Sequence, residues 1–247
     1  MVGDEMPRFF SARENIQDNT IKLTGSDAEH ISRVLRSEIG DSITVCDSMG
    51  NDYNTIISEI SKNEISLEIK ERFRTESEPS IKITLYQGLP KGDKMDLIIQ
   101  KCVEIGVYKI VPVNTERCIV KLDKNKERKK LERWQKISEA AAKQCGRGII
   151  PEIGNIINFD EAIKNVGCDR SIIPYELEND RGLKSFLKDY SGESIAVFIG
   201  PEGGFAKDEI DKAINCGIVP VTLGKRILRT ETAGLISIAN MLFYLDM

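Results

Sequence analysis

The last third of the chain contains the same unit twice, an apolar strand followed by a glycine-containing loop and a helix. Residues 194–199 (SIAVFI) run into 200–204 (GPEGG) and a predicted helix over 207–215. Residues 219–223 (VPVTL) run into 224–229 (GKRILR) and a final helix. Apolar runs of this length that alternate with helices are typical of the buried strands of a parallel sheet. The repeat therefore predicts an α/β layer fold in this part of the chain.

The strand pattern is different before residue 75. There, short β-branched or alternating segments such as 42–46 (SITVC) and 64–69 (EISLEI) are separated by turn residues, which predicts a small β-barrel with one short helix over 27–36. The segment 74–80 (RTESEPS) is polar and contains a proline, as linkers between domains often do. We therefore expect two domains, residues 1–74 and 75–247, with an α/β fold and a parallel sheet in the second.

Histidine and cysteine usage excludes several kinds of site. The chain has 247 residues but only one histidine, His30, so a zinc site with two histidine ligands cannot form within one chain. Its six cysteines contain no Cys-x-x-Cys pair, and we expect them to be buried, reduced thiols. The sequence therefore predicts no metal and no disulfide framework.

No segment of the sequence is suited to a membrane. The most apolar stretch, residues 235–245, is too short to cross a hydrocarbon core of about 30 Å, and the charged first eight residues are not a signal peptide. With the reduced cysteines, this predicts a cytoplasmic protein without a membrane partner. The closing apolar helix, 232–245, either lies inside its domain or packs against a second copy of the chain, and the sequence leaves both open.

The net charge of −4 hides an uneven distribution. Residues 91–147 contain 15 Lys and Arg against 8 Asp and Glu, and residues 121–136 (KLDKNKERKKLERWQK) contain 8 against 3. This density of positive charge is sufficient for contacts with nucleic-acid phosphates if the chain displays it on one face. A solvated helix surface is an equally good interpretation.

The two glycine-containing loops are candidates for a ligand site, because loops at the carboxyl edge of an α/β sheet are where such folds bind ligands. Neither loop has the spacing of a dinucleotide-binding or P-loop motif, which disfavours a nucleotide phosphate. The glycines allow close approach of the backbone, and Ile227 and Leu228 offer an apolar wall. This combination suits an adenosyl group without phosphates, although a Gly-Pro-Glu-Gly-Gly loop taken alone is more often a simple turn.

Two of these segments are distinctive when taken together, 198–205 (FIGPEGGF) and 223–233 (LGKRILRTETA). They resemble the SPOUT class of S-adenosylmethionine-dependent RNA methyltransferases. Further segments narrow the resemblance to the RsmE family, the bacterial 16S ribosomal RNA uridine-N3 methyltransferases, and the resemblance covers essentially the whole chain. These segments are 6–10 (MPRFF), 30–36 (HISRVLR), 91–96 (KGDKMD), 100–107 (QKCVEIGV), 133–134 (RW) and 139–147 (EAAAKQCGR).

The resemblance implies an N-terminal PUA-like β-barrel for RNA binding, a C-terminal SPOUT methyltransferase domain with a trefoil knot, and a homodimer. It implies S-adenosyl-L-methionine as cofactor and 16S ribosomal RNA of the small ribosomal subunit as partner. The methyl donor is expected to lie between three loops. The expected cofactor-binding residues are Pro174, Tyr175, Glu176, Ile199, Gly200, Pro201, Glu202, Gly203, Gly204, Leu223, Gly224, Ile227, Leu228, Thr232 and Ala233.

Methylation of uracil N3 requires removal of a proton and stabilisation of the charge that develops on O2 and O4. Arg8, Arg147 and Arg229 lie in the matching motifs and are the candidate cationic groups. Glu231 is a candidate base, but it could equally serve the N-terminus of its helix, so the identity of the base stays open. We expect RNA phosphates to contact the barrel and the basic residues Lys91, Lys94, Arg128, Lys129 and Arg133.

Two other functions stay open at this point. One is a methyltransferase of the same class that acts on another RNA or another atom. The other is a non-catalytic RNA-binding factor of ribosome assembly, which would have the barrel and the basic helix but would bind no methyl donor. Binding of the donor and identity of the methylated product distinguish the three.

Overall fold

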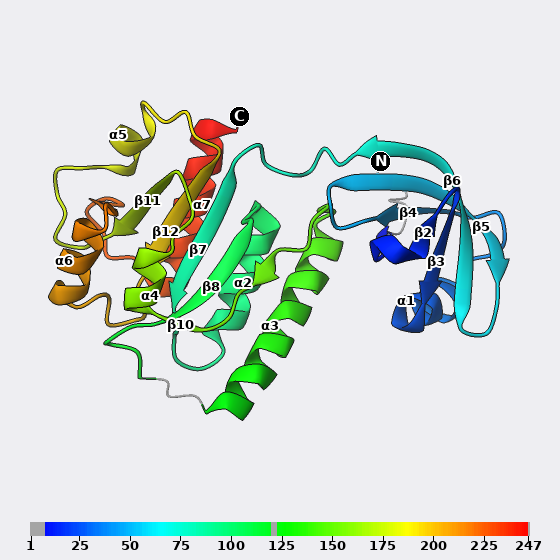
Figure 1. Cartoon of the computed structure of the whole chain (residues 1–247), viewed down its shortest axis with the longest axis horizontal. Helices are drawn as coiled ribbons and strands as arrows, with labels where there is room; N and C mark the ends of the chain where they lie inside the picture. The colour runs from blue at the N-terminus through cyan, green and yellow to red at the C-terminus, as the bar shows by residue number, and fades with distance from the viewer. Residues whose placement is uncertain (1–7, 120–122, 247) are drawn as a thin grey trace. The chain divides into compact units, whose positions relative to one another are not determined.

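The computed structural model describes residues 8–119 and 123–246 of the chain. Met6 and Pro7 of the segment 6–10, and Lys121 of the basic stretch, lie outside these ranges. The chain forms two compact units (Figure 1). The first contains the described residues up to Glu78 together with Ala142–Ile150, and the second contains the remaining described residues from Pro79 onward.

This division differs from the predicted one in two respects: the first unit extends to Glu78 rather than to residue 74, and it includes a later segment of the chain. The sequence gives no reason to separate Ala142–Ile150 from the second domain, yet these residues belong to the first unit. The Glu78 carboxylate explains why, because it accepts hydrogen bonds from Arg147 Nη2 at 2.6 Å, from Gly148 N at 2.9 Å and from Ile149 N at 3.1 Å. The position of the domain boundary stays a proposal.

The first unit is built on a six-stranded sheet with the order β1-β4-β5-β6-β3-β2. Its neighbours pair antiparallel except β1 and β4, which are parallel. Alternating burial along β3 shows that one face of the sheet covers the core. The strands are β1 (Arg8–Phe10), β2 (Ile16–Gln17), β3 (Thr20–Thr24), β4 (Ser42–Cys46), β5 (Asn51–Ile60) and β6 (Glu64–Arg74).

The helical part of the first unit differs from the prediction. A 3-10 turn, η1 (Arg13–Asn15), precedes it. Helix α1 (Gly25–Glu29) continues into a π-helical segment, η2 (His30–Leu35). This segment ends at Leu35, and the following residue Arg36 has a left-handed φ of 54°, so the helical part ends within one residue of the predicted end.

The second unit contains a seven-stranded sheet in which every pairing is parallel. The main path has the order β10-β8-β7-β12-β11-β13, and β9 pairs with β8. The strands are β7 (Lys82–Gly88), β8 (Lys109–Asn114), β9 (Glu152–Ile153), β10 (Ile157–Asn158), β11 (Arg170–Pro174), β12 (Ser194–Ile199) and β13 (Val219–Val221). The parallel sheet confirms the α/β class predicted from the strand–loop–helix repeat.

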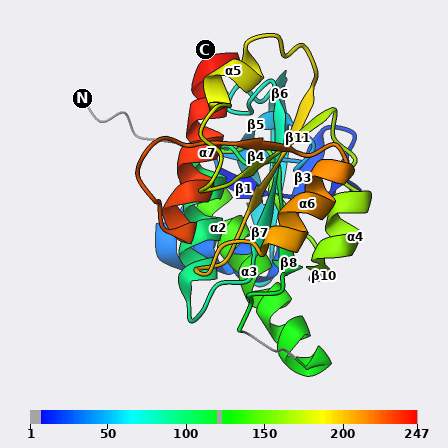
Figure 2. The ribbon, with the colours of Figure 1, turned by 90° about the vertical axis from the view of Figure 1, so that its left-hand side faces the viewer.

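Helices cover both faces of this sheet, as Figure 2 shows. Helices α2 and α7 lie on one face, and α4 and α6 lie on the other. Among the described residues, no helix is long and apolar enough to span a bilayer. The helices of this unit are α2 (Lys94–Ile105), α3 (Lys124–Gln144), α4 (Phe159–Lys164), α5 (Leu183–Leu187), α6 (Lys207–Asn215) and α7 (Thr230–Leu245), of which α3 extends into the segment grouped with the first unit.

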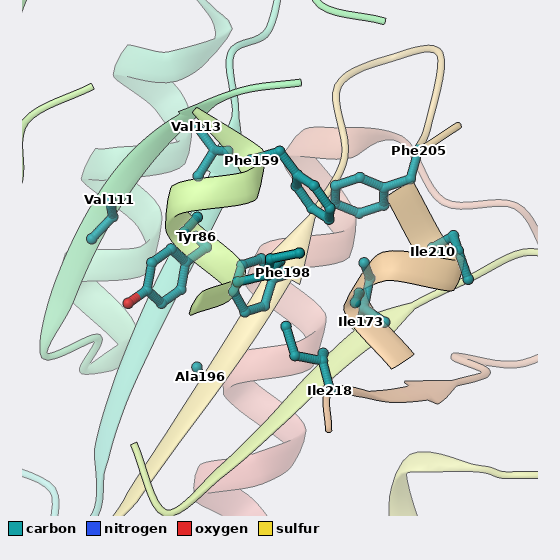
Figure 3. Close-up of a cluster of buried hydrophobic side chains, with 13 residues drawn as sticks. Tyr86, Val111, Val113, Phe159, Ile173, Ala196, Phe198, Phe205, Ile210 and Ile218 are labelled. Atoms are coloured by element: carbon teal, nitrogen blue, oxygen red, sulfur yellow. The ribbon is translucent and has the colours of Figure 1, made fainter. Parts of the chain in front are cut away.

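Aromatic packing fixes the central strand β12 (Figure 3). Phe198 stacks on Tyr86 with ring centroids 4.4 Å apart, and Phe159 meets Phe198 edge-on at 6.3 Å. Phe159 also packs against Phe205 at 5.4 Å. Because Phe198 and Phe205 flank residues 200–204, this cluster anchors both ends of the loop that the sequence singled out.

Candidate functional site

Three neighbouring strands, β12, β11 and β13, end at the same edge of the parallel sheet. The segments that follow them surround a cavity of about 530 Å³, which we call the edge cavity. Cavities at this edge of a parallel sheet are the usual ligand sites of α/β folds. The two loops identified from the sequence and the segment 174–176 therefore meet at one place.

The edge cavity contains almost the whole set of residues expected to bind the cofactor. Every one of them lines the cavity except Thr232. Thr232 instead donates its backbone N–H to Arg229 O at 2.9 Å, within the first turn of α7. The candidate catalytic residues Arg229 and Glu231 also line it. The other lining residues, which the sequence did not indicate for the cofactor, are Lys94, Asn179, Phe205, Thr222, Lys225, Arg226 and Thr230. Most of these residues lie next to the predicted loops in the sequence. Lys94 is far from those loops in the sequence and reaches the cavity only through the fold.

A buried hydrogen-bond chain joins the start of α7 to the loop after β12. Gln87 Nε2, at the end of β7, donates to Thr230 Oγ1 at 2.9 Å. Thr230 Oγ1 donates in turn to Gly200 O at 2.6 Å. Removal of the Thr230 hydroxyl would leave a buried carbonyl without its donor, which costs about 1–3 kcal/mol. The wall of the edge cavity is thus fixed by side chains that the ligand itself need not contact.

Glycines allow the backbone to approach closely around the loop 200–204. A Cβ on Gly200 would lie 2.9 Å from the carbonyl carbon of Gly204, and a Cβ on Gly88 would lie 2.7 Å from the Pro201 ring. Gly204 has a φ of 66°, which favours glycine. Arg117 Nη1 donates to Gly203 O at 2.7 Å and holds the loop from outside.

Lys94 and Glu202 form an ion pair at the rim of the edge cavity. Lys94 Nζ lies 2.7 Å from Glu202 Oε1, and Lys91 N donates to the same oxygen at 3.1 Å. Burial raises the pKa of Glu202, but hydrogen bonds from Lys94 and Lys91 outweigh it and the net shift is downward. Lys94 was expected to contact RNA, and the structure places it against the loop of the expected donor site.

Glu231 is a half-buried carboxylate that lines the edge cavity from the first turn of α7. Its side chain is 16% exposed, and within the described residues its Oε2 has no hydrogen-bond partner. Lys94 Nζ lies 3.9 Å from Oε2, and Arg229 Nη1 lies 4.0 Å from Oε1. A buried carboxylate oxygen without a hydrogen bond is costly, so this atom is placed to accept a proton or a hydrogen bond from a ligand.

The candidate cationic groups fall into two sets. Arg229 is exposed and lines the edge cavity. Arg8 and Arg147 belong to the first unit, where Arg8 Nη2 lies 2.6 Å from Asp52 Oδ1 and Arg8 Nε donates to Arg147 O at 3.2 Å. Arg147 is 4% exposed and pairs with Glu78. Both arginines therefore have a structural role within the first unit, and their catalytic role stays a prediction.

The basic residues of α3 are displayed on its surface. Arg128, Lys129 and Arg133 are exposed. Arg128 Nε lies 3.7 Å from Glu132 Oε1, and Arg133 pairs with Asp96 on α2. The buried Trp134 donates its indole N–H to the same Asp96 at 3.2 Å and anchors α3 to α2. Lys129 is thus the residue of this set whose charge is least compensated by a neighbour.

A larger cavity of about 780 Å³ lies at the opposite, amino edge of the same sheet. Residues 166–171 and 216–219, which lead into β11 and β13, line it, and they include none of the residues expected to bind the cofactor. The described residues contain no group of three or more His, Cys, Asp or Glu side chains placed to hold a metal ion. We therefore centre the site on the edge cavity, where the loops converge.

Comparison with protein families decides what kind of protein this is. Residues 76–242 match the family described as RNA methyltransferase domain, which is well over half of the chain. The chain belongs to this family. Residues 23–70 of this RNA methyltransferase match a second family, described as RNA methyltransferase PUA domain. The match confirms the predicted enzyme class, and the PUA match confirms the predicted nature of the first unit.

Individual relatives cover nearly the whole RNA methyltransferase. It is 33% identical to the ribosomal RNA small subunit methyltransferase E of Bacillus subtilis, over 98% of each chain. It is 32% identical to the protein of the same name from Synechocystis, over 95% of this chain and 76% of that one. These matches confirm the resemblance to the RsmE family.

A solved structure supports the same conclusion. The ribosomal RNA small subunit methyltransferase E of Neisseria gonorrhoeae, described as bound to S-adenosyl methionine, superposes with a TM-score of 0.84 at 36% identity. The superposition covers 97% of this chain and 98% of that one. The fold class is therefore the predicted one, a SPOUT-class α/β methyltransferase domain with an N-terminal PUA-like domain.

Proposed function

We propose that the chain transfers the methyl group of S-adenosyl-L-methionine to N3 of a uridine in 16S ribosomal RNA. One observation carries the proposal: the loops expected to bind the donor converge on one cavity at the carboxyl edge of three adjacent strands. Membership of the RNA methyltransferase family and relatives named for the small ribosomal subunit support the choice of reaction and substrate.

The edge cavity fits such a donor. The glycines allow the loop 200–204 to fold closely on itself at the cavity wall, and the apolar side chain of Ile227, which is 89% exposed, lines the same cavity. When bound there, S-adenosylmethionine would supply a methyl group activated by its sulfonium charge. We propose that residues 200–204 with Ile227 and Leu228 hold it, as lining residues of the cavity.

Glu231 is our candidate for the group that accepts the N3 proton. Glu231 is the acidic residue in the first turn of α7, so its charge also favours the N-terminus of that helix. Its buried Oε2 has no hydrogen-bond partner among the described residues, which leaves that oxygen available to accept a proton. Arg229, at the mouth of the same cavity, is placed to stabilise negative charge on O2 or O4 of the uracil as the proton leaves. The positive charge of Lys94, which lies 3.9 Å from Glu231 Oε2, would contribute to the same stabilisation.

We further propose RNA binding through the PUA-like unit, Lys91 and the exposed basic residues of α3, and assembly of the chain into a homodimer. The apolar helix α7 supports the dimer, because Phe243 is 69% exposed and Ile236 and Tyr244 are also exposed. A substrate in the small ribosomal subunit places the reaction in the cytoplasm.

Mapping of the methylated nucleoside tests the proposal. The protein is incubated with small-subunit RNA and S-adenosylmethionine that carries an isotopically labelled methyl group, and the digested RNA is analysed by mass spectrometry. We expect label in N3-methyluridine at one position. Label in another nucleoside or on a ribose would indicate a different target atom, and RNA binding without any transfer would indicate a non-catalytic factor.

A further inference from the structure

The first unit contains a cavity that the reaction does not use. It has a volume of about 560 Å³, and three arginines, Arg13, Arg72 and Arg74, line it. We call it the arginine cavity. None of these arginines was among the residues expected from the sequence to contact RNA or the methyl donor. All of them belong to the unit that contains the segment matched as a PUA domain.

Strand pairing places the arginine side chains together. In the antiparallel pair β5–β6, Arg72 lies opposite Tyr53 and Arg74 lies opposite Asn51. Residues two apart on a strand point to the same face, so Arg72 and Arg74 extend over one patch of the sheet. Arg13 reaches the same cavity from η1. Three guanidinium groups therefore converge from two distant parts of the unit.

The acidic side chain Asp47 lies beside these arginines but is held within its own turn rather than in an ion pair with them. Its Oδ1 accepts hydrogen bonds from Met49 N at 2.8 Å and Asn51 N at 3.1 Å. Its Oδ2 accepts from Asn51 Nδ2 at 2.6 Å and from the Tyr53 hydroxyl at 3.4 Å. The carboxylate is thus saturated within the turn between β4 and β5, where left-handed backbone at positions 48 and 50 makes this geometry accessible.

The guanidinium charges are only partly compensated by acidic side chains in the part of the chain that the structure describes. None of the three arginines has a carboxylate within ion-pair distance there. Arg72 donates to the backbone oxygen of Asp18 and lies over the Tyr53 ring, 5.8 Å from its centroid. Asp18 also lines the cavity, so the lining carries three positive and two negative side chains. The lining thus has a net positive charge, which a bound anion would offset.

We propose that the arginine cavity binds a backbone phosphate of the RNA substrate. This inference rests on the proposed function, because it assumes that RNA is the ligand. A phosphate fits better than a base, since Arg72 covers the Tyr53 ring and Tyr53 is only 8% exposed, which leaves no free aromatic face for stacking. Guanidinium groups bind phosphate oxygens through paired, charge-assisted hydrogen bonds.

The test compares two double variants that remove the same charge. Arg13→Gln/Arg74→Gln removes two arginines from the cavity and leaves Arg72, which packs on Tyr53. Lys22→Gln/Lys70→Gln removes two exposed lysines of the same unit that are ion-paired with Glu64 and Glu68 and do not line the cavity. Binding of each full-length protein to a labelled small-subunit RNA fragment, and to an unrelated RNA of equal length, is measured by fluorescence anisotropy between about 50 and 200 mM salt.

We expect the arginine variant to bind both RNAs several-fold more weakly and to lose about 0.7 from the slope of log K against log salt for each phosphate contact removed. The lysine variant should keep the wild-type slope. Calorimetric titration with S-adenosylmethionine should be unchanged in both, because the edge cavity lies in the second unit. Circular dichroism and thermal unfolding then show whether the altered first unit is folded.

Three results would overturn the inference: an unchanged slope in the arginine variant, an equal fall in the lysine variant, or a loss confined to the small-subunit fragment, since that would indicate reading of bases. Each leaves the proposed function intact when the wild type still methylates its RNA. A wild-type protein that binds no RNA would overturn both proposals.

Discussion

At the scale of single residues, the most direct test concerns Glu231, the candidate base. The change Glu231→Gln keeps the shape of the side chain but removes its ability to take a proton. If Glu231 is the base, turnover should fall by about 10²-fold or more, because general base catalysis contributes about 10²–10⁴-fold. Affinity for S-adenosylmethionine should stay within a few-fold of wild type. Single-turnover methylation and calorimetry on the same preparations check this, with Arg229→Ala as a second variant that should also slow transfer.

Wild-type turnover in Glu231→Gln would eliminate Glu231 as the base. Retained turnover in Arg229→Ala would show that another cation stabilises the uracil oxygens. Lys94 would then be the next group to change, because it is the other cationic side chain within 4 Å of Glu231 in the described structure.

Cys102 gives a prediction for alkaline pH. Burial raises the pKa of the Cys102 thiol from 9.0 to about 12. Above pH 9 the unfolded chain releases this proton while the folded chain keeps it, so the free energy of unfolding falls as the pH rises from about 9 toward 12. Urea unfolding at pH 7, 9 and 10 should show this loss, and Cys102→Ala should show less of it. The same pH dependence in both proteins would contradict the assignment.

At the scale of elements, we expect α3 to bind RNA phosphates through its positive charge. Lys129→Glu should weaken RNA binding and lower the salt slope, because the exposed Lys129 is the predicted phosphate contact whose charge is least compensated. Lys188→Glu is the matched control, since Lys188 is also exposed but follows α5. The measurement is RNA binding at several salt concentrations. If both variants weaken binding equally, net charge rather than α3 is responsible.

The secondary-structure elements also show which parts of the fold can be predicted from the sequence. The strand–loop–helix repeat was enough to predict the parallel sheet and two of the segments around the edge cavity, because buried strands and glycine loops have local signatures. Lys94 and the segment Ala142–Ile150 have no such signature. Their positions depend on ion pairs with Glu202 and Glu78, which lie far away in the sequence. For the same reason, the sequence could not foresee that Arg8 pairs with Asp52.

At the scale of the whole molecule, the prediction concerns assembly. Helix α7 presents Ile236, Phe243 and Tyr244 at its surface, and we expect a second copy of the chain to cover them. Light scattering after gel filtration should give twice the chain mass of 27.7 kDa. Phe243→Asp should shift the mass toward that of one chain, because a charge would be buried in the interface. A wild-type mass of one chain would contradict the dimer.

The measurement that tests the central claim most directly is calorimetric titration with S-adenosylmethionine, with and without small-subunit RNA. We predict saturable binding at one site per chain. Thr230→Val should bind the donor more weakly than wild type, because it removes the hydroxyl that holds Gly200 beside the edge cavity. Thr232→Val, which alters a residue outside the cavity lining, should have the smaller effect. Absence of saturable binding under both conditions would contradict the assignment of the edge cavity as a methyl-donor site.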